Sequence, residues 1–348
     1  MGRGRDAGRH RRLSQTRRAA QTAVVLLAVT AGPVGASELD RTVLDRFRPV
    51  LRYAAEERGF ATSVEAMAGR AGTRLVDANG GVIAGEGAPM LTAGTLGSRY
   101  AIPGRRRAGR DDRLVTPGRP LTRGRRSKPR DVVYGHAARG GDGARWLQYW
   151  LFYEDNPQDR GLLKTGRHAG DWEFVQVRLD AEGRPDRLTM AQHAWSESCD
   201  WADIERSAHA PVLYVANASH ATYHRPGTQD RPWPDPNDEA DGKGRRVRPE
   251  LETITATSPG WVAWPGRWGE TLRSPVPAES SSPRGPAFKD DRRFDDPTAF
   301  DASARACGSG PPGRPWQTPA LLAPVLVLAV IAGRRRRRGK RRHADRAP

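Results

Sequence analysis

Residues 166–180 have the sequence GRHAGDWEFVQVRLD, and the segment 172–180 alternates between two kinds of side chain. Side chains of a β-strand point to opposite faces in turn, so the pattern predicts a strand here. One face would carry Asp171, Glu173, Val175, Val177 and Leu179. Three of these five residues are aliphatic, which predicts that this face is buried. The two carboxylates at its beginning are unusual, because burying unpaired charge is costly.

Other segments also favour strands. LQYWLFY (147–153) is aromatic, PVLYVANASHATY (211–223) begins with a β-branched run, and WVAWPG (261–266) is a further short strand candidate. Aromatic and β-branched residues fit the pleated surface of a sheet. Pro and Gly separate these segments at close intervals. The chain is therefore predicted to be all-β, with a β-sandwich core, long irregular loops and one or two short helices, for example near 63–68.

The N-terminal residues 1–36 combine an Arg-rich start, a short apolar run and the small residues Gly35 and Ala36. This order is typical of a secretory signal peptide cut near Ala36. A retained N-terminal anchor is the alternative.

At the other end, residues 316–333 (WQTPALLAPVLVLAVIAG) contain no charge and have about the minimum length of a transmembrane helix. The basic tail 334–348 follows and is predicted to be cytoplasmic by the positive-inside rule. The alternative is a sorting signal that is cleaved and replaced by another anchor. In both cases we expect the globular part outside the cytoplasm, at the cell membrane.

The net charge of +18 would suggest a nucleic-acid partner, but its distribution argues against one. Residues 1–18 have a net charge of +6, residues 334–348 of +8 and residues 104–130 of +9, so the remainder is slightly acidic. Basicity confined to two tails and one loop predicts no nucleic-acid binding.

The globular material is predicted to form one domain over 40–270. Residues 104–130 are rich in Arg, Gly and Pro and should form a mobile insertion. Residues 271–315 have the composition of a stalk. Export permits a disulfide between Cys199 and Cys307, but they are far apart in sequence, so the paired and unpaired states both stay open.

Four side chains near the start of the 172–180 strand form a candidate metal site: Asp155, His168, Asp171 and Glu173. His168 lies in a glycine-flanked turn, and Asp155 ends the aromatic strand, so it joins them if the two strands are neighbours. Three carboxylates and one imidazole suit Mg²⁺, Ca²⁺ or Mn²⁺, with Zn²⁺ as an alternative. The competing explanation is salt bridging to arginine.

His193 and His220 each follow an apolar run and are expected to project at a strand end. They are the candidates for an acid or base in catalysis. The structural alternative for each is a hydrogen-bonded histidine without a chemical role.

Three of these segments, LQYWLFYEDNP, HAGDWEFVQV and APVLYVANASHATY, resemble the vacuolar protein sorting-associated protein 62 family. Residues 46–67 (RFRPVLRYAAEERGFATSVEAM) are similar to the opening segment of that family, which implies a strand over 49–53. The resemblance covers roughly 46–67 and 131–270 and implies no established reaction. The export signals of this chain give no support to a role in vacuolar sorting.

A more distant resemblance connects LFYEDNP (151–157) and GRHAGDWE (166–173) with the necrosis- and ethylene-inducing-like proteins, which are secreted β-sandwich cytolysins. That family carries a Gly-His-Arg-His-Asp-Trp-Glu heptapeptide after an aromatic strand. The resemblance implies that the four candidate ligands hold a divalent cation that helps to bind a membrane lipid headgroup. Two departures put the lipid specificity in doubt: Gly170 replaces the second His, and the linker after Asp155 is longer.

These observations favour an exported, membrane-tethered binding module whose cation holds a glycan or lipid headgroup. One rival is a metal-dependent hydrolase that uses His193 or His220. Another is a surface scaffold without metal, in which arginine pairs with the carboxylates.

Overall fold

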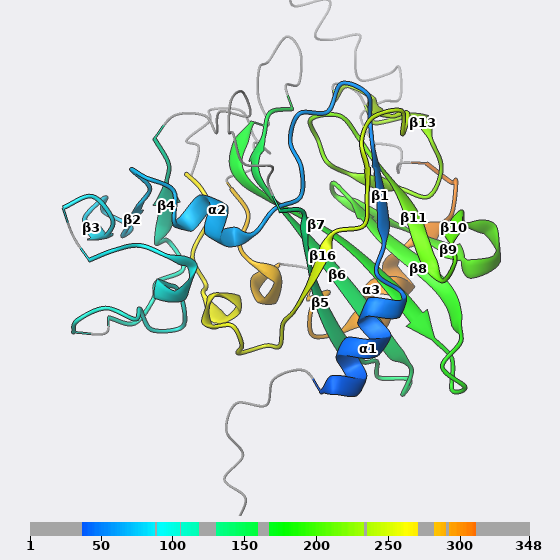
Figure 1. Ribbon diagram of the computed structural model, residues 1–348, viewed down its shortest axis with the longest axis horizontal. Helices are drawn as coiled ribbons and strands as arrows, with labels where there is room; N and C mark the ends of the chain where they lie inside the picture. Colours follow the sequence, from blue (N-terminus) through cyan, green and yellow to red (C-terminus); the bar gives the residue numbers. More distant parts are fainter. Residues whose placement is uncertain are drawn as a thin grey trace, which may run out of the picture. The chain divides into compact units, whose positions relative to one another are not determined.

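The computed structural model describes residues 37–87, 89–104, 106–117, 130–158, 167–232, 235–270, 282–289 and 292–310 (Figure 1). The predicted signal peptide, the apolar segment 316–333 and the basic tail lie outside these residues. Among the described residues, no helix is long and apolar enough to cross a membrane.

The largest sheet contains seven strands within the described residues, in the order β16-β5-β6-β7-β8-β9-β17. They are β16 (Glu250–Thr253), β5 (Val132–Arg139), β6 (Arg145–Asn156), β7 (His168–Leu179), β8 (Pro185–Gln192), β9 (Trp195–Asp200) and β17 (Arg305–Ala306). Strands β5 to β9 form an antiparallel meander, and β16 and β17 add parallel pairs at the two edges. The strands predicted around 147–153 and 172–180 are thus confirmed as β6 and β7.

A second sheet, of five strands in the described part of the chain, is built around a parallel pair, β1 and β11. Its members are β1 (Val50–Tyr53), β10 (Arg206–Ser207), β11 (Ala210–Val215), β12 (Thr222–Tyr223) and β15 (Arg246–Val247). Leu51 and Leu213 of this sheet share one buried cluster with Tyr149, Val175 and Val177 of the large sheet. The two sheets therefore pack face to face, as the predicted β-sandwich requires.

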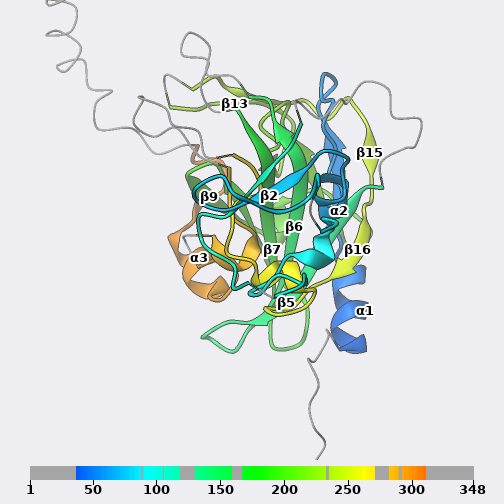
Figure 2. The same cartoon turned by 90° about the vertical axis from the view of Figure 1, so that its left-hand side faces the viewer.

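The opposite face of the large sheet is also covered. Trp172 and Phe174 of β7 belong to a second buried cluster, together with Leu75 and Leu114 of a small three-stranded sheet. That sheet comprises β2 (Arg74–Val76), β3 (Val82–Ala84) and β4 (Arg113–Val115) and lies beside α2 (Val64–Ala68). Figure 2 shows β2 and α2 in front of β6 and β7. The aliphatic face of β7 is buried as predicted, but its aromatic face is buried as well.

The remaining elements are short: α1 (Glu38–Arg46), α3 (Pro297–Ser303), β13 (Gly227–Gln229), β14 (Asp238–Ala240) and the 3₁₀ turns η1 (Ala93–Thr95), η3 (Trp201–Asp203), η4 (Gly260–Ala263) and η5 (Pro286–Phe288). The helix predicted near 63–68 is confirmed as α2. The strand predicted at 261–266 is wrong, because residues 260–263 form η4. A short apolar run fits a buried turn as well as a strand, and here Trp261 and Val262 are buried by a turn.

Part of the predicted insertion 104–130 is folded. β4 pairs with β2, and the buried Asp112 accepts hydrogen bonds from the Tyr100 hydroxyl (2.6 Å) and the Gly109 amide (2.8 Å). One buried carboxylate thus orders a segment whose composition suggests a loop. Residues 118–129 of the insertion lie outside the described residues.

Part of the predicted stalk 271–315 also packs on the sandwich. β17 pairs with β9, Phe300 of α3 contacts Phe174, and Cys307 forms a disulfide with Cys199. The covalent bond and the added edge strand hold this segment in place despite its Pro- and Ser-rich composition. The pairing left open by the sequence is therefore formed.

Candidate functional site

The pairing of β6 with β7 brings all four predicted ligands to one end of the large sheet, with Asp155 on β6 and the other three on β7. Tyr153 lies opposite Asp171, Asp155 opposite Ala169, and Asn156 opposite His168. The two strands are therefore neighbours, as the metal hypothesis requires. His168 is the first residue of β7 rather than part of a turn, because the pairing with β6 continues to Asn156.

Asp171 is held by neutral and imidazole donors, not by arginine, among the described residues. Its Oδ1 accepts the Trp172 amide (3.0 Å), and its Oδ2 accepts Asn156 Nδ2 (3.2 Å) and His220 Nδ1 (3.0 Å). Burial alone would raise the pKa of Asp171, but the His220 hydrogen bond and the charge of His168 lower it below its ordinary value. Asp171 is therefore an ionised carboxylate at neutral pH.

Glu173 lies two residues further on the same face and is only 9% exposed. Within the described residues it forms no hydrogen bond or ion pair. Burial and the neighbouring Asp171 charge raise the pKa of Glu173 well above its ordinary value, although Lys289 and Arg293 oppose this effect. A buried carboxylate without a donor, beside an ionised one, is the arrangement that a cation would neutralise.

His220 supports Asp171 from the second sheet's side. It is fully buried, adopts a left-handed backbone (φ 60°) in the turn between β11 and β12, and stacks on the Tyr153 ring at 3.9 Å. Its Nε2 lies 3.9 Å from Glu57 Oε1. Burial would lower the pKa of His220, but Asp171, Glu57 and Asp155 raise it. His220 thus lies between two strands, and its full burial directs the ring at Asp171 and not at solvent. A role of His220 as an acid or base stays a prediction.

Glu57 is itself fixed by three backbone amides. Oε1 accepts from Arg58 and Gly59, both at 2.6 Å, and Oε2 accepts from Ala218 at 2.6 Å. The side chain thus ties the segment after β1 to the turn that carries His220. Sequence reasoning missed this role, since Glu57 lies in a polar stretch without periodicity.

His193 belongs to an adjoining polar network around Asp238. His193 follows β8 with a left-handed backbone (φ 53°), and its Nε2 bonds Asp238 Oδ2 at 2.5 Å. Tyr223 and Ser219 donate to the same carboxylate at 2.6 and 2.7 Å. Burial would raise the pKa of Asp238, but His193, Arg231 and Tyr223 lower it to about 2. The charge of Asp238 also acts on Glu173, so the two networks are neighbours.

The donor types at this end fit a divalent cation. Asp155 is half-buried on β6, and its charge acts on His220. His168 Nδ1 lies 2.9 Å from the Gly170 carbonyl. Because a carbonyl only accepts, Nδ1 carries the proton, and a neutral ring would keep the Nε2 lone pair for a metal. The side chains are not gathered as ligands, however. Within the described ranges, no three of the four predicted residues have their ligand atoms within 4.8 Å of one another.

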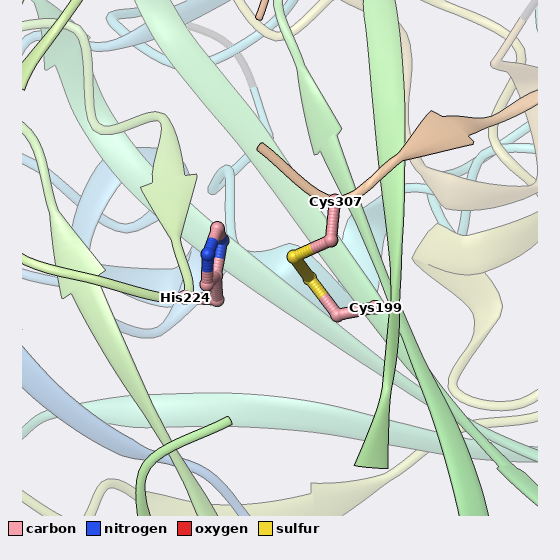
Figure 3. A group of neighbouring side chains, drawn as sticks. All are labelled: Cys199, His224 and Cys307. Carbon is pink, nitrogen blue, oxygen red and sulfur yellow. A yellow bond between two sulfur atoms is a disulfide. The ribbon is translucent and has the colours of Figure 1, made fainter. Parts of the chain in front are cut away.

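The group that does meet this distance consists of Cys199, His224 and Cys307 (Figure 3). Figure 3 shows the His224 ring beside the disulfide. Both sulfur atoms are bonded to each other, and metal binding needs thiolates. In this oxidised form the group is a covalent link and not a metal site.

Gly170 shows why the heptapeptide motif is altered here. Its backbone is left-handed (φ 63°), and a Cβ at this position would lie 2.1 Å from the carbonyl oxygen of Trp268. The segment around Trp268 therefore occupies the space that a side chain at position 170 would need.

The family model of vacuolar protein sorting-associated protein 62 matches residues 157–231. This span is well under half of the chain and includes the segments HAGDWEFVQV and APVLYVANASHATY, so the resemblance seen in the sequence is confirmed there. None of the curated proteins matches the chain in sequence.

Among solved structures, several necrosis- and ethylene-inducing proteins are similar. Necrosis and Ethylene inducing Protein 2 from the causal agent of cocoa's witches' broom disease is 14% identical, with a TM-score of 0.30 over 64% of this chain and 77% of that chain. NLPPya in complex with mannosamine is 16% identical, with a TM-score of 0.31 over 64% and 75%. The non-toxic HaNLP3 protein is 15% identical, with a TM-score of 0.32 over 64% and 77%.

Proposed function

We propose that this chain is an exported, membrane-tethered binding module. Its acidic site would hold a divalent cation and, through it, the hydroxyl groups of a glycan or lipid headgroup. The observation that carries this proposal is the buried carboxylate of Glu173, which has no hydrogen-bond donor among the described residues and lies beside the ionised Asp171. A cation supplies the missing positive charge.

Asp155, His168, Asp171 and Glu173 would hold the ion. When bound, it supplies positive charge and vacant positions for hydroxyl oxygens, the ligands that hard cations prefer. The side chains must move to gather around it, and Glu173 is the freest to do so. Asp171 stays anchored by His220, whose own position is fixed by stacking on Tyr153.

A partly exposed aromatic ring near the neighbouring network suits a sugar ligand. Trp195 is half-buried, lies 5.5 Å from the His193 ring and donates from Nε1 to Gln192 (3.1 Å). An aromatic face of this kind can stack on the apolar face of a sugar ring. Recognition would thus combine coordination of hydroxyls with ring stacking.

The location outside the cytoplasm is proposed from the two apolar segments that lie next to the basic ends of the chain. The Cys199–Cys307 disulfide is consistent with it, because disulfides persist in oxidising compartments. The segment 316–333, followed by the basic tail, would provide the anchor.

A metal-dependent hydrolase is the second candidate, and one contact favours it. His193 is 16% exposed at its side chain and is oriented by the buried Asp238, which is how a general base is commonly held. His220 is fully buried and would position Asp171 instead of touching a substrate. Turnover of a bound ligand that His193→Ala abolishes, without loss of metal, would favour this function over simple binding.

The proposal is tested by metal content and thermal stability of the full chain. We expect one divalent ion per chain after exposure to Ca²⁺, Mg²⁺, Mn²⁺ or Zn²⁺. At an ion concentration a hundredfold above the dissociation constant, the gain is about 2.7 kcal/mol, which raises the melting temperature by about 5 °C or more. Chelator should reverse both effects, and Glu173→Gln should abolish both.

Glu252→Gln is the matched control. Like Glu173, Glu252 has a pKa raised by burial, but it is half-buried and lies on the edge strand β16. The Glu252→Gln substitution should leave the ion content and the response of the melting temperature to chelator unchanged. A wild-type chain that retains no ion, with a melting temperature indifferent to chelator, would contradict the proposal.

A further inference from the structure

A cavity of about 530 Å³ lies at the end of the sandwich opposite the acidic site. Residues of α1, the β5–β6 turn and the β7–β8 turn line it. In Figure 1, α1 lies at this lower end and β13 at the upper end. β13 pairs with β14, whose first residue is Asp238. The volume falls within the range of small-molecule sites.

The charged residues of the lining are mostly basic. They are Arg46, Arg139, Arg145, Arg178, Asp142 and Asp180. Both carboxylates already have partners. Asp142 pairs with Arg178 at 3.2 Å, and Asp180 pairs at 2.9 Å with Arg184, outside the lining. Arg145 pairs with Asp40 of α1.

Two arginines of the lining, Arg46 and Arg139, have no carboxylate partner among the described residues. Both residues are exposed. The Arg46 guanidinium carbon lies 5.3 Å from the centre of the Phe47 ring. Arg139 lies directly opposite Arg145 on the neighbouring strand. Like charges in such a cross-strand pair are unfavourable. An anion between them would turn this repulsion into attraction.

The cavity also has an apolar part. Val43 is half-buried there, beside Phe47 and Leu179, which are each only 2% exposed and present little surface. Guanidinium groups recognise the oxygens of phosphate and sulfate through paired N–H donors. The half-buried Val43 beside them offers an apolar contact to a ring or a short carbon skeleton. A bare inorganic ion would use only the basic part.

We propose that this cavity binds the phosphate or sulfate group of a sugar-sized ligand, with Arg46 and Arg139 as the principal contacts. The site is separate from the acidic end of the sandwich and needs no cation. It would thus give the module a second, anion-selective contact.

Calorimetric titration of the full chain at low ionic strength tests the proposal with three probes: glucose 6-phosphate, inorganic phosphate and glucose. We expect glucose 6-phosphate to bind more tightly than inorganic phosphate, and glucose not to bind there. Each of Arg46→Gln and Arg139→Gln should weaken glucose 6-phosphate binding about tenfold, as for loss of a charged hydrogen bond. Raising the salt concentration should weaken it further.

Arg41→Gln is the matched control, because Arg41 is exposed on the same helix and lies outside the lining. It should change affinity less than twofold. Equal affinity for glucose 6-phosphate and inorganic phosphate would support the anion site and identify free phosphate as its ligand. Absence of saturable binding for every probe, or an equal loss in all three variants, would overturn the proposal. Chelator should have no effect, which separates this test from that of the acidic site.

Discussion

At one end of β6 and β7, Asp171 and Glu173 are 5% and 9% exposed, whereas at the other end the side chains of Arg145 and Arg178 are 25% and 31% exposed. The same two strands thus carry buried negative charge at one end and hydrated positive charge at the other. Buried charge must be matched by donors inside the protein. Hydrated charge interacts with water and is weakly coupled to stability.

The difference follows from what covers each end. The turns that hold His220 and His193, together with β14, close over the carboxylates, and their donors come from segments far apart in sequence. At the basic end, α1 and two hairpin turns leave a cavity. We therefore expect substitutions at the acidic end to lower the free energy of unfolding strongly, and substitutions at the basic end to lower it only slightly.

The largest contrast is expected between two left-handed glycines. Gly170→Ala, at the acidic end, combines an unfavourable backbone conformation with the contact to the Trp268 carbonyl oxygen. It should lower the free energy of unfolding by about 4 kcal/mol, from typical costs of strain and overpacking. Denaturant unfolding of the full chain measures this.

Gly183→Ala is its counterpart at the basic end. Gly183 is also left-handed (φ 78°), but a Cβ added there would have no neighbouring atom within 4 Å. Only the backbone cost of about 1 kcal/mol is expected. Equal losses for the two variants would show that the close packing at Gly170 is unimportant.

The second contrast concerns a buried carboxylate. Asp238→Asn should cost about 3 kcal/mol at pH 7, because it breaks the contacts with His193, Ser219 and Tyr223. The folded-state pKa of about 2 is below the ordinary value of 3.8. The stability that Asp238 contributes is therefore present above about pH 4 and lost as the pH falls toward 2.

Unfolding free energies at pH 7, 4 and 2 test this sign. The wild type should lose about 2 kcal/mol through this group across that window, and the variant should lack this component. A variant with the same acid dependence as the wild type would assign the acid sensitivity to other carboxylates.

The smallest effect is expected for the matched change at the basic end. Asp142→Asn removes a partly exposed partner of Arg178 and should change stability by less than about 1 kcal/mol. Arg178 keeps its ion pair with Asp186 (2.5 Å), but the loss of one negative charge from the cavity lining should tighten binding of glucose 6-phosphate about two- to threefold. Titration and thermal unfolding measure the two effects separately, and weaker binding would argue against an anion at this end.

Much of this pattern could be predicted from local sequence. The alternation at 172–180 predicted β7 and its aliphatic inner face, and the aromatic run at 147–153 predicted its neighbour β6. The four candidate ligands were found because strand geometry places Asp171 and Glu173 on one face. The metal itself stays a prediction.

The errors have a common physical cause. WVAWPG was predicted as a strand because a short apolar run does not distinguish a strand from a buried turn. The folded parts of 104–130 and 271–315 were missed because Asp112, β17 and the Cys199–Cys307 bond stabilise them through distant partners. Composition reports only local preference.

The sequence by itself determined the strands β6 and β7, the aliphatic inward face of β7 and the charge at each chain end, because these follow from side-chain period and composition. Only the tertiary structure decided that His220, Glu57 and Asp238 surround the acidic pair. It also decided that both faces of β7 are covered and that the opposite end carries an arginine-lined cavity. These features arise where segments far apart in sequence meet, as in the 161-residue separation between Glu57 and Ala218. No local pattern encodes such contacts.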